Sequence, residues 1–262
     1  MNTEQLLISG WTWNPAVILP AIVALVFYVI AFRINPRIWY FIAAVGIVFL
    51  ALVSPINTLA DGYLFSAHML QHMLLLLIIP ALLLLSLPRS FAAPRFLGKG
   101  LHPVAGWMAG VGSMWFWHAP ALCNAATTSK PVFAFQTISL LVFGGIFWWQ
   151  VIAPRDRDRL SPPAAIIYLF TACTACTVLG IILTFSPVAV CSAYMHPADP
   201  QGLLNTLRTG WGMTPEKDQQ IGGLLMWVPM CTIYLTAIFA QLVRWFSPAN
   251  PGYVHASREE NQ

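Results

Sequence analysis

The sequence predicts an all-α integral membrane protein: one polytopic domain over residues 1–262, built as a bundle of seven transmembrane helices. The chain is 58% hydrophobic and only 8% charged, whereas a soluble domain carries about 25% charged residues. Such a composition cannot cover a water-facing surface. The apolar residues gather into seven stretches near the ~20-residue length that crosses a bilayer, and the loops between them alternate in basic charge.

The predicted spans follow one another with short loops until the last one. Trp11 and Trp13 precede the first span as interfacial anchors. Glycines dilute the fourth span, and Gly106 and Gly110 form a small-xxx-small pair suited to close helix packing. The seven predicted spans cover residues 15–32, 38–53, 64–87, 101–118, 132–152, 164–185 and 219–246.

The seventh helix has a clear start signal in Thr214-Pro215-Glu216. Threonine is a favoured N-cap residue, and proline is favoured at the first helical position. The long loop before it, about residues 186–217, carries Cys191, Tyr194 and His196. This long outer loop therefore ends where the last helix begins.

Basic residues fix the expected orientation. Of the 13 lysines and arginines, ten fall in alternate loops and the C-terminal tail, including Arg95, Lys99 and Arg258. By the positive-inside rule the N-terminus lies outside and the C-terminus is cytoplasmic. Glu4 and the lack of a basic n-region argue against a cleavable signal peptide. No basic patch interleaved with aromatic residues suggests a nucleic-acid partner.

The cysteines do not suggest a disulfide framework. There are five, an odd number, and their spacing is uneven. Cys173 and Cys176 lie near the middle of the sixth span, and Cys231 lies at a similar depth in the seventh. We expect these small residues to serve mainly in helix packing.

The third span opens with His68 and His72, four residues apart and so on one helix face. The predicted orientation places them in the outermost turns of that span. His118 ends the fourth span at the same side. Polar, ionisable residues in spans are costly and indicate functional sites. By contrast, His102 and His255 fall on the inner side, where we expect ordinary hydrogen-bonded roles.

Two carboxylates share the outer side: Asp61 precedes the third span, and Asp218 opens the seventh helix. With the three histidines they form a candidate metal site: His68, His72, His118, Asp61 and Asp218. Structural alternatives remain open, since Asp61 can cap a turn and Asp218 favours the positive end of its helix. Either can also orient an imidazole rather than bind the ion.

Soft ligands nearby indicate the metal. Met69 and Met73 directly follow the two histidines, and Met226 lies two turns into the seventh helix. Thioethers select Cu(I), while imidazole also serves zinc and iron. The sequence therefore favours copper, as Cu(I) or Cu(II), over zinc. The candidate secondary or transfer ligands are Met69, Met73, Met226 and His196, although methionines in spans also commonly serve in packing.

The sequence resembles the multi-spanning CtaG-type cytochrome c oxidase assembly factors of bacteria. The resemblance rests on SPINTLAD at 54–61, HMLQHMLLLLIIP at 68–80, WFWHAPAL at 115–122, FWWQVI at 147–152, LGIILTFS at 179–186 and TPEKDQQIGGLLMWVP at 214–229. These stretches run from the second span to the seventh. The pattern HMxxHM together with DQQxxGGLLMW is the specific part.

The resemblance implies a non-enzymatic, multi-pass protein of the bacterial plasma (inner) membrane that helps copper reach the buried copper centre of a haem–copper oxidase. Its implied partners are an oxidase subunit in the same membrane and a copper donor protein. The histidines at 68, 72 and 118 and the aspartates at 61 and 218 match the family's. One departure is Gln136, because family members often carry histidines in that region.

Other classes fit the same residues. Three histidines and an aspartate near one face also suit a membrane-embedded zinc-dependent hydrolase. Two of the histidines can serve as axial ligands in a b-haem electron-transfer protein, or the polar cluster can be structural in a scaffolding assembly protein. No nucleophile–base pair or phosphate-binding loop is visible, so any catalytic alternative depends on a metal.

Overall fold

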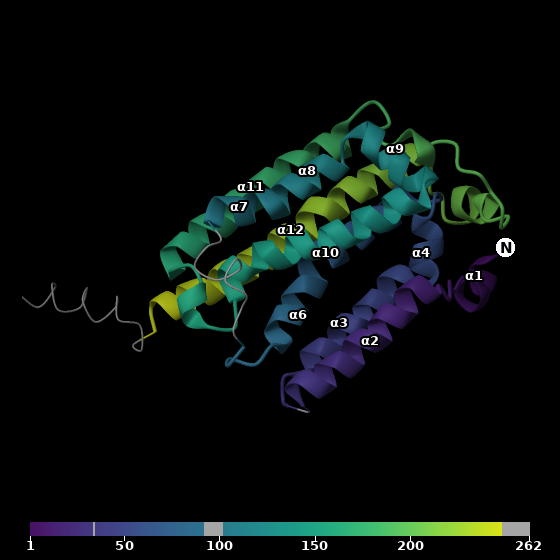
Figure 1. Ribbon diagram of the computed structural model, residues 1–262. Helices are drawn as coiled ribbons and strands as arrows, with labels where there is room; N and C mark the ends of the chain where they lie inside the picture. Colours follow the sequence, from purple (N-terminus) through teal and green to yellow (C-terminus); the bar gives the residue numbers. More distant parts are fainter. Residues whose placement is uncertain (34, 92–101, 248–262) are drawn as a thin grey trace, which may run out of the picture.

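The computed structural model describes residues 1–33, 35–91 and 102–247, and over these residues it is all-helical with no strand. Figure 1 shows the helices as one elongated bundle, with the α2–α3 hairpin along one flank. Five positions named above lie outside the described residues: Arg95, Lys99, Leu101, His255 and Arg258.

Five helical segments are long and apolar enough to cross a membrane. They are α2 (Pro15–Phe32), Phe65–Ser86, α10 (Lys130–Ile152), α11 (Pro162–Phe185) and α12 (Pro215–Trp245). Phe65–Ser86 consists of α5 (Phe65–Met73), the π-helical turn η1 (Leu74–Ile78) and α6 (Ile79–Ser86).

The other two predicted spans are also helical but shorter. The second is α3 (Ile38–Leu52), an apolar helix below the length of a full span. The fourth is α7 (Pro103–Trp107), the π-helical turn η2 (Met108–Gly112) and α8 (Ser113–Trp117) in direct succession. The membrane character of the chain is thus supported, while the count of seven crossings stays a prediction.

The sequence signals set several helix starts. The Asn14 side chain accepts a hydrogen bond from the Ala16 N–H, and Pro15 occupies the first position of α2. The predicted start of the seventh helix is confirmed, because the Thr214 hydroxyl accepts the Lys217 N–H at 3.3 Å. Each cap satisfies an amide that the helix leaves without an internal partner.

The core forms where four segments meet. α12 packs along α11 and against α5, while α10 packs against α6 and η1. The Gly106–Gly110 pair packs within the bundle, since a Cβ at Gly106 would lie 2.9 Å from the Gln150 side chain and one at Gly110 2.6 Å from Phe147. The small residues therefore let α7 and η2 approach α10 closely.

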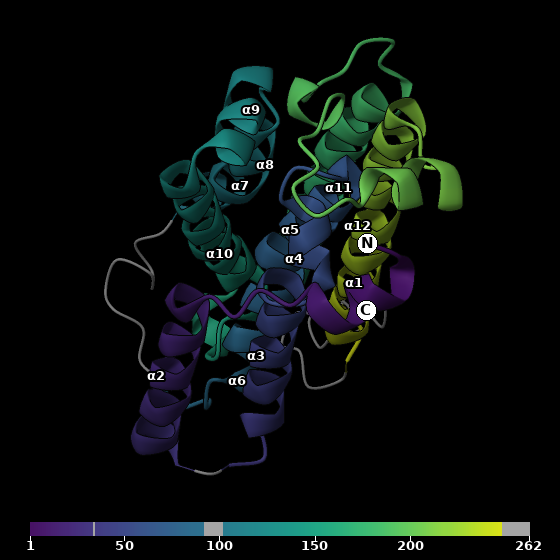
Figure 2. The same cartoon turned by 90° about the vertical axis from the view of Figure 1, so that its right-hand side faces the viewer.

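One end of the bundle carries a layer of short elements, which Figure 2 views face on. Its helices are α1 (Thr3–Ser9), α4 (Pro55–Ala60) and α9 (Pro120–Thr128), joined by η4 (Ser192–Tyr194) and the π-helical turn η5 (Thr206–Gly210). The chain's first residue belongs to this layer, because the Thr206 hydroxyl donates to the Met1 carbonyl at 2.8 Å. We call this end the capped end.

A tyrosine fastens the loop between α11 and α12 to the capped end. The Tyr63 hydroxyl donates to the Asp199 carboxylate at 3.1 Å and accepts the Gln201 N–H at 3.2 Å. Burial of the ring raises the pKa of the Tyr63 hydroxyl above its ordinary value. The hydroxyl therefore stays protonated at neutral pH and keeps its donor role.

Arginines gather at the opposite end, where their guanidinium groups donate to main-chain carbonyls. Arg37 donates to Leu87 at 2.8 Å, and Arg159 donates to Ala153 at 2.6 Å. The short helix η3 (Asp156–Asp158) lies here and pairs with Arg159 at 3.0 Å. The two ends thus differ sharply in basic charge.

Candidate metal centre

The helix that carries two histidines is started by a residue of another helix. Leu64 precedes α5 and offers no side-chain cap. Instead, the fully buried Asp218 of α12 accepts the backbone N–H of Phe65 at 2.7 Å and that of Ser66 at 3.0 Å. A carboxylate at a helix N-terminus also complements the helix dipole. Asp218 therefore fixes where α5 begins and joins it to α12.

A glycine sets the spacing of these two helices one turn further on. A Cβ at Gly222 would lie 2.5 Å from the Phe65 ring and 3.2 Å from the Met69 Cγ. Any larger residue would push α12 away from α5. The glycine thus lets α12 approach α5 closely and places Met69 in the interface.

The two α5 histidines lie side by side in the core. Their ring centroids are 4.5 Å apart, and the exposed fractions of His68 and His72 are 1% and 2%. All four of their ring nitrogens are buried without a hydrogen-bond partner. Buried polar atoms are ordinarily hydrogen-bonded, so such orphans call for an explanation, such as an ion.

His118 meets this pair from the end of α8. Its ring centroid lies 5.1 Å from that of His72. Its Nδ1 lies 2.6 Å from the Met114 carbonyl, and its Nε2 lies 3.1 Å from the Met69 sulfur. Because a carbonyl only accepts, Nδ1 carries the proton in the neutral ring, and Nε2 presents its lone pair to the thioether.

These four side chains, His68, His72, His118 and Met69, are called the histidine cluster below. In it an imidazole lone pair faces a thioether lone pair, and neither atom has a proton to share. Metal–nitrogen and metal–sulfur bonds of about 2.0 and 2.3 Å let two such ligand atoms share one ion. The donor set, imidazole with thioether, suits a soft ion such as Cu(I).

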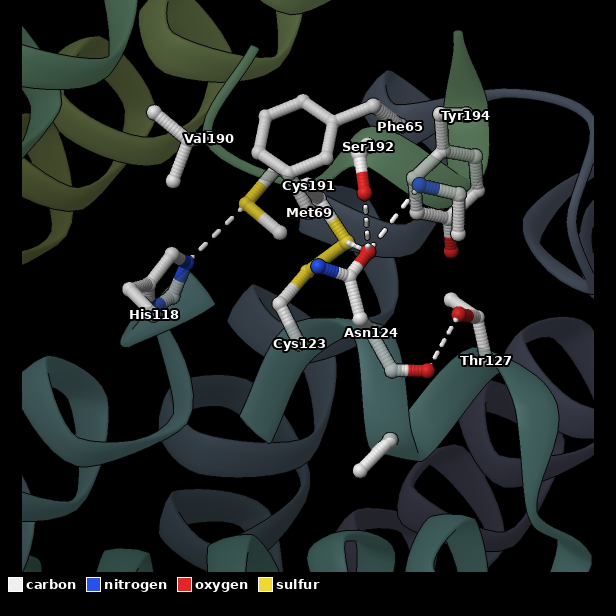
Figure 3. Close-up of a disulfide and its surroundings, with 12 residues drawn as sticks. Phe65, Met69, His118, Cys123, Asn124, Thr127, Val190, Cys191, Ser192 and Tyr194 are labelled. Atoms are coloured by element: carbon white, nitrogen blue, oxygen red, sulfur yellow. Dashed lines mark hydrogen bonds between the residues drawn. A yellow bond between two sulfur atoms is a disulfide. The ribbon is translucent and has the colours of Figure 1, made fainter. Parts of the chain in front are cut away.

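A disulfide stands next to the cluster and corrects the sequence prediction. Cys123 of α9 is bonded to Cys191, which lies 68 positions further along the sequence. Figure 3 shows Met69 and His118 among the side chains around this bond. The odd number of cysteines argued against disulfides in general. In the structure two cysteines pair, and the three free ones lie elsewhere in the fold. Long-range pairing leaves no spacing signal in a sequence.

Asn124 reinforces the disulfide. Its side-chain oxygen accepts the Ala193 N–H at 3.0 Å and the Ser192 hydroxyl at 3.2 Å, as the dashed lines to Ser192 and the neighbouring main chain in Figure 3 illustrate. Together with the Cys123–Cys191 bond, these contacts hold η4 over the cluster.

We call η4 the lid of the cluster. Its last residue, Tyr194, contacts the histidines. Its ring centroid lies 5.8 Å from His68 and 5.8 Å from Phe65. Its hydroxyl donates to the Ala60 carbonyl at 2.8 Å. The buried ring therefore closes the cluster toward the capped end, a role that the sequence did not reveal.

Gln136 brings α10 to the cluster. Its side chain is buried and interacts with His72, while its Nε2 has no hydrogen-bond partner. The sequence signal for this role was a polar glutamine within the mostly apolar run KPVFAFQTI. Gln136 therefore adds α10 to the elements that surround the site, which also include α5, α8 and α12.

The remaining predicted residues lie outside the cluster or in its packing. Asp61 is exposed at the end of α4, and His196 is exposed in the loop between α11 and α12. Met73 and Met226 are buried in the same core as Met69. His102 has the structural role expected of it, since its Nδ1 accepts the Val104 N–H at the start of α7.

Within the described ranges, no three His, Cys, Asp or Glu side chains are positioned to hold one metal ion as they stand. The histidine cluster adds a thioether, which that set of residue types leaves out. Binding of one ion by all three histidines requires the rings of His68 and His72 to turn. Such a rotation would break no hydrogen bond of these ring nitrogens.

Residues 28–247 match the family model described as "Cytochrome c oxidase caa3 assembly factor (Caa3_CtaG)". The chain belongs to this family of cytochrome c oxidase assembly factors. The match includes every element of the histidine cluster, from α5 to α12. Family membership agrees with the membrane character of the long apolar helices.

The chain is also 24% identical over 206 residues to the uncharacterized protein ML1998 of Mycobacterium leprae (strain TN). The aligned region is 70% of this chain but 30% of that relative, so this assembly factor spans a minor part of its length. No solved structure matches the chain.

Proposed function

We propose that this assembly factor is a seven-span protein of the bacterial plasma membrane that holds copper in its histidine cluster and passes it to a haem–copper oxidase. The observation that carries the proposal is the buried, partner-free state of four imidazole nitrogens beside the His118–Met69 contact. Oxidase assembly is the family's role, and copper is the cargo that this donor set suits.

The arrangement favours copper delivery over the alternatives. Rings of His68 and His72 in direct contact leave no gap for a porphyrin between them, which disfavours a b-haem. A catalytic zinc site keeps three ligands and an open position for water, but Tyr194 closes the cluster. Thioether ligands bind less firmly than thiolates, and a delivery protein needs ligands that exchange.

Each predicted ligand has a place in this proposal. His68, His72 and His118 bind the ion, with Met69 as the thioether ligand. Asp218 positions the cluster by fixing the start of α5. Met73 and Met226 extend the sulfur surface into the core. The exposed Asp61 and His196 belong to the outer surface, where a copper donor protein would dock.

Two independent features support an outward-facing cluster. Basic residues concentrate at the end opposite to the capped end, as the positive-inside rule requires for N-terminus outside. The Cys123–Cys191 disulfide lies at the capped end, and disulfides persist in oxidising compartments such as the bacterial periplasm. Both support a cluster on the side from which extracytoplasmic copper arrives.

The test is elemental analysis with an absorption spectrum of the purified, full-length protein. We expect copper in the wild type, retained in the control His102→Asn, which keeps a capping side chain at the start of α7. The double variant His68→Ala/His72→Ala should lose essentially all copper from the cluster and lower oxidase activity in cells. His118→Ala should weaken binding while leaving the α5 pair intact.

The rival functions give different results. Zinc in place of copper would indicate the hydrolase, and a Soret band would indicate haem. No metal in the wild type, with oxidase assembly unchanged in His68→Ala/His72→Ala, would leave a scaffold and refute the proposal.

A further inference from the structure

A second group of sulfur atoms lies in the seam between α11 and α12, away from the histidine cluster. The Sγ atoms of Cys173 and Cys231 are 2.8 Å apart. The Thr177 hydroxyl lies 3.1 Å from the Cys231 sulfur. Cys176 is buried on the same helix beside Tyr234. The three cysteines that take no part in the disulfide are therefore neighbours.

Tight packing holds this seam together. A Cβ at Gly180 would lie 2.6 Å from the Trp227 side chain, and one at Gly223 would lie 2.6 Å from the Thr184 nitrogen. α11 and α12 therefore approach closely on the side of the cysteines nearer the capped end. This contact keeps the Cys173 and Cys231 sulfurs together without a covalent link.

The cysteine pair is linked to the histidine cluster through α12. Gly222, which touches Met69, is nine residues before Cys231, a distance of about 14 Å along a helix axis. Between them Met226 and Met230 are both buried, four residues apart and in the same core as Met69 and Met73. Sulfur atoms thus occur at successive turns from the cluster toward the middle of the helix.

We propose that Cys173 and Cys231 form a second, deeper site that takes Cu(I). The identity of the metal rests on the proposed function. Thiolates select Cu(I), and Cu(I) accepts two sulfur ligands in a linear arrangement. A two-sulfur site needs no third ligand, which agrees with the absence of a three-ligand group among the described residues.

Binding is a ligand exchange without electron transfer. Each thiol loses its proton, two copper–sulfur bonds form, and the two protons leave to water or to the ligands that released the ion. The Thr177 hydroxyl donates to the Cys173 carbonyl at 2.9 Å, and at 3.1 Å from the Cys231 sulfur it is close enough to turn its proton toward a thiolate. Cys173 and Cys231 are both only partly buried, so an ion held there is reachable from the side of the bundle.

Cu(I) titration of the full-length protein against a chromogenic chelator, with ascorbate as reductant, tests this site. We expect Cys173→Ser/Cys231→Ser to lose about half of the copper bound, because the variant removes both thiolate ligands of one of the two proposed sites. The matched control Cys176→Ser should keep it all. X-ray absorption of His68→Ala/His72→Ala should show copper surrounded by sulfur alone.

Alkylation of the unmutated protein tests the site without any folding risk. Copper should protect Cys173 and Cys231 from N-ethylmaleimide in the folded protein. Equal labelling with and without copper would overturn the site. So would a Cys173–Cys231 disulfide, detected when the unfolded, unreduced protein labels Cys176 alone.

The two proposals fail separately. If copper is lost only in His68→Ala/His72→Ala, the histidine cluster is supported as a copper site and the cysteine site is refuted. If copper is lost only in Cys173→Ser/Cys231→Ser, the cysteine site is supported and the histidine cluster is refuted as a copper site.

Discussion

The α2–α3 hairpin and the α5–α12 pair are both apolar, yet they serve different purposes. Only 6% of α2 is buried inside the structure, against 56% of the most apolar stretch of Phe65–Ser86. α2 lies on the flank of the bundle (Figure 1), and most of its side chains are exposed, as expected of a lipid-facing helix. Hydropathy identifies both as membrane helices but does not tell which one holds a site.

The difference lies in the polar residues that the apolar surroundings contain. α5 and α12 bury His68, His72 and Asp218, whereas in α2 the buried residue is Tyr28. Tyr28 has an ordinary partner, since its hydroxyl donates to the Ser86 carbonyl at 2.7 Å. A partnered polar group stabilises packing, and a partner-free buried group calls for an explanation such as a bound ion or water molecule.

The largest difference in stability is expected when the cap of α5 and the cap of α2 are each removed. Asp218→Ala leaves the buried Phe65 and Ser66 amides without partners, and each orphaned group costs about 1–3 kcal/mol. Asn14→Ala removes the exposed cap of α2 and costs about 1 kcal/mol. Unfolding in mixed detergent, followed by circular dichroism, measures both losses.

Asp218→Asn grades the same effect, because an amide offers one acceptor oxygen in place of two. Its loss of stability should fall between those of the wild type and Asp218→Ala. Copper affinity should fall in the same order, since the cap sets the register of the histidine helix. Equal losses for Asp218→Ala and Asn14→Ala would show that the buried cap has no special role.

The sequence predicted the helices well because their signals are local. The predicted bounds of all seven apolar segments agree with the structure within four residues in the described part of the chain, and the Thr214-Pro215 start is a local pattern. The approach of His118 to His72 also followed, because the loop charges place both on one side. That these residues bind copper stays a prediction.

What the sequence missed is long-range. The Cys123–Cys191 bond, the Tyr194 lid and the Gln136 contact all join segments whose distance in sequence carries no periodic signal. For Asp218 the sequence left a metal-binding role and a structural role open, and the fold adds that both its oxygens accept backbone amides. Only the fold shows which partner a buried carboxylate has.

Two glycines give the second contrast. Gly222→Ala places a methyl group 2.5 Å from the Phe65 ring, and such overpacking costs about 1–3 kcal/mol. Gly46→Ala on α3 meets nothing within 4 Å and should gain up to about 1 kcal/mol from helix propensity. The same detergent unfolding assay compares them, and Gly222→Ala should also lower copper binding. A neutral Gly222→Ala would mean that α12 can move away from α5 freely.

Substitutions of two tyrosines, Tyr194 and Tyr40, give the smallest expected difference. They separate the effect of the Tyr194 hydrogen bond from the effect of the Tyr194 ring. Tyr194→Phe removes the donor to the buried Ala60 carbonyl but keeps the ring against His68, so it should cost about 1 kcal/mol while copper stays bound. Tyr40→Phe on the exposed face of α3 should change neither quantity. Tyr194→Ala removes the ring as well and should speed copper release to a chelator. If Tyr194→Phe alone releases copper as fast as Tyr194→Ala, the hydroxyl rather than the ring holds the cluster closed.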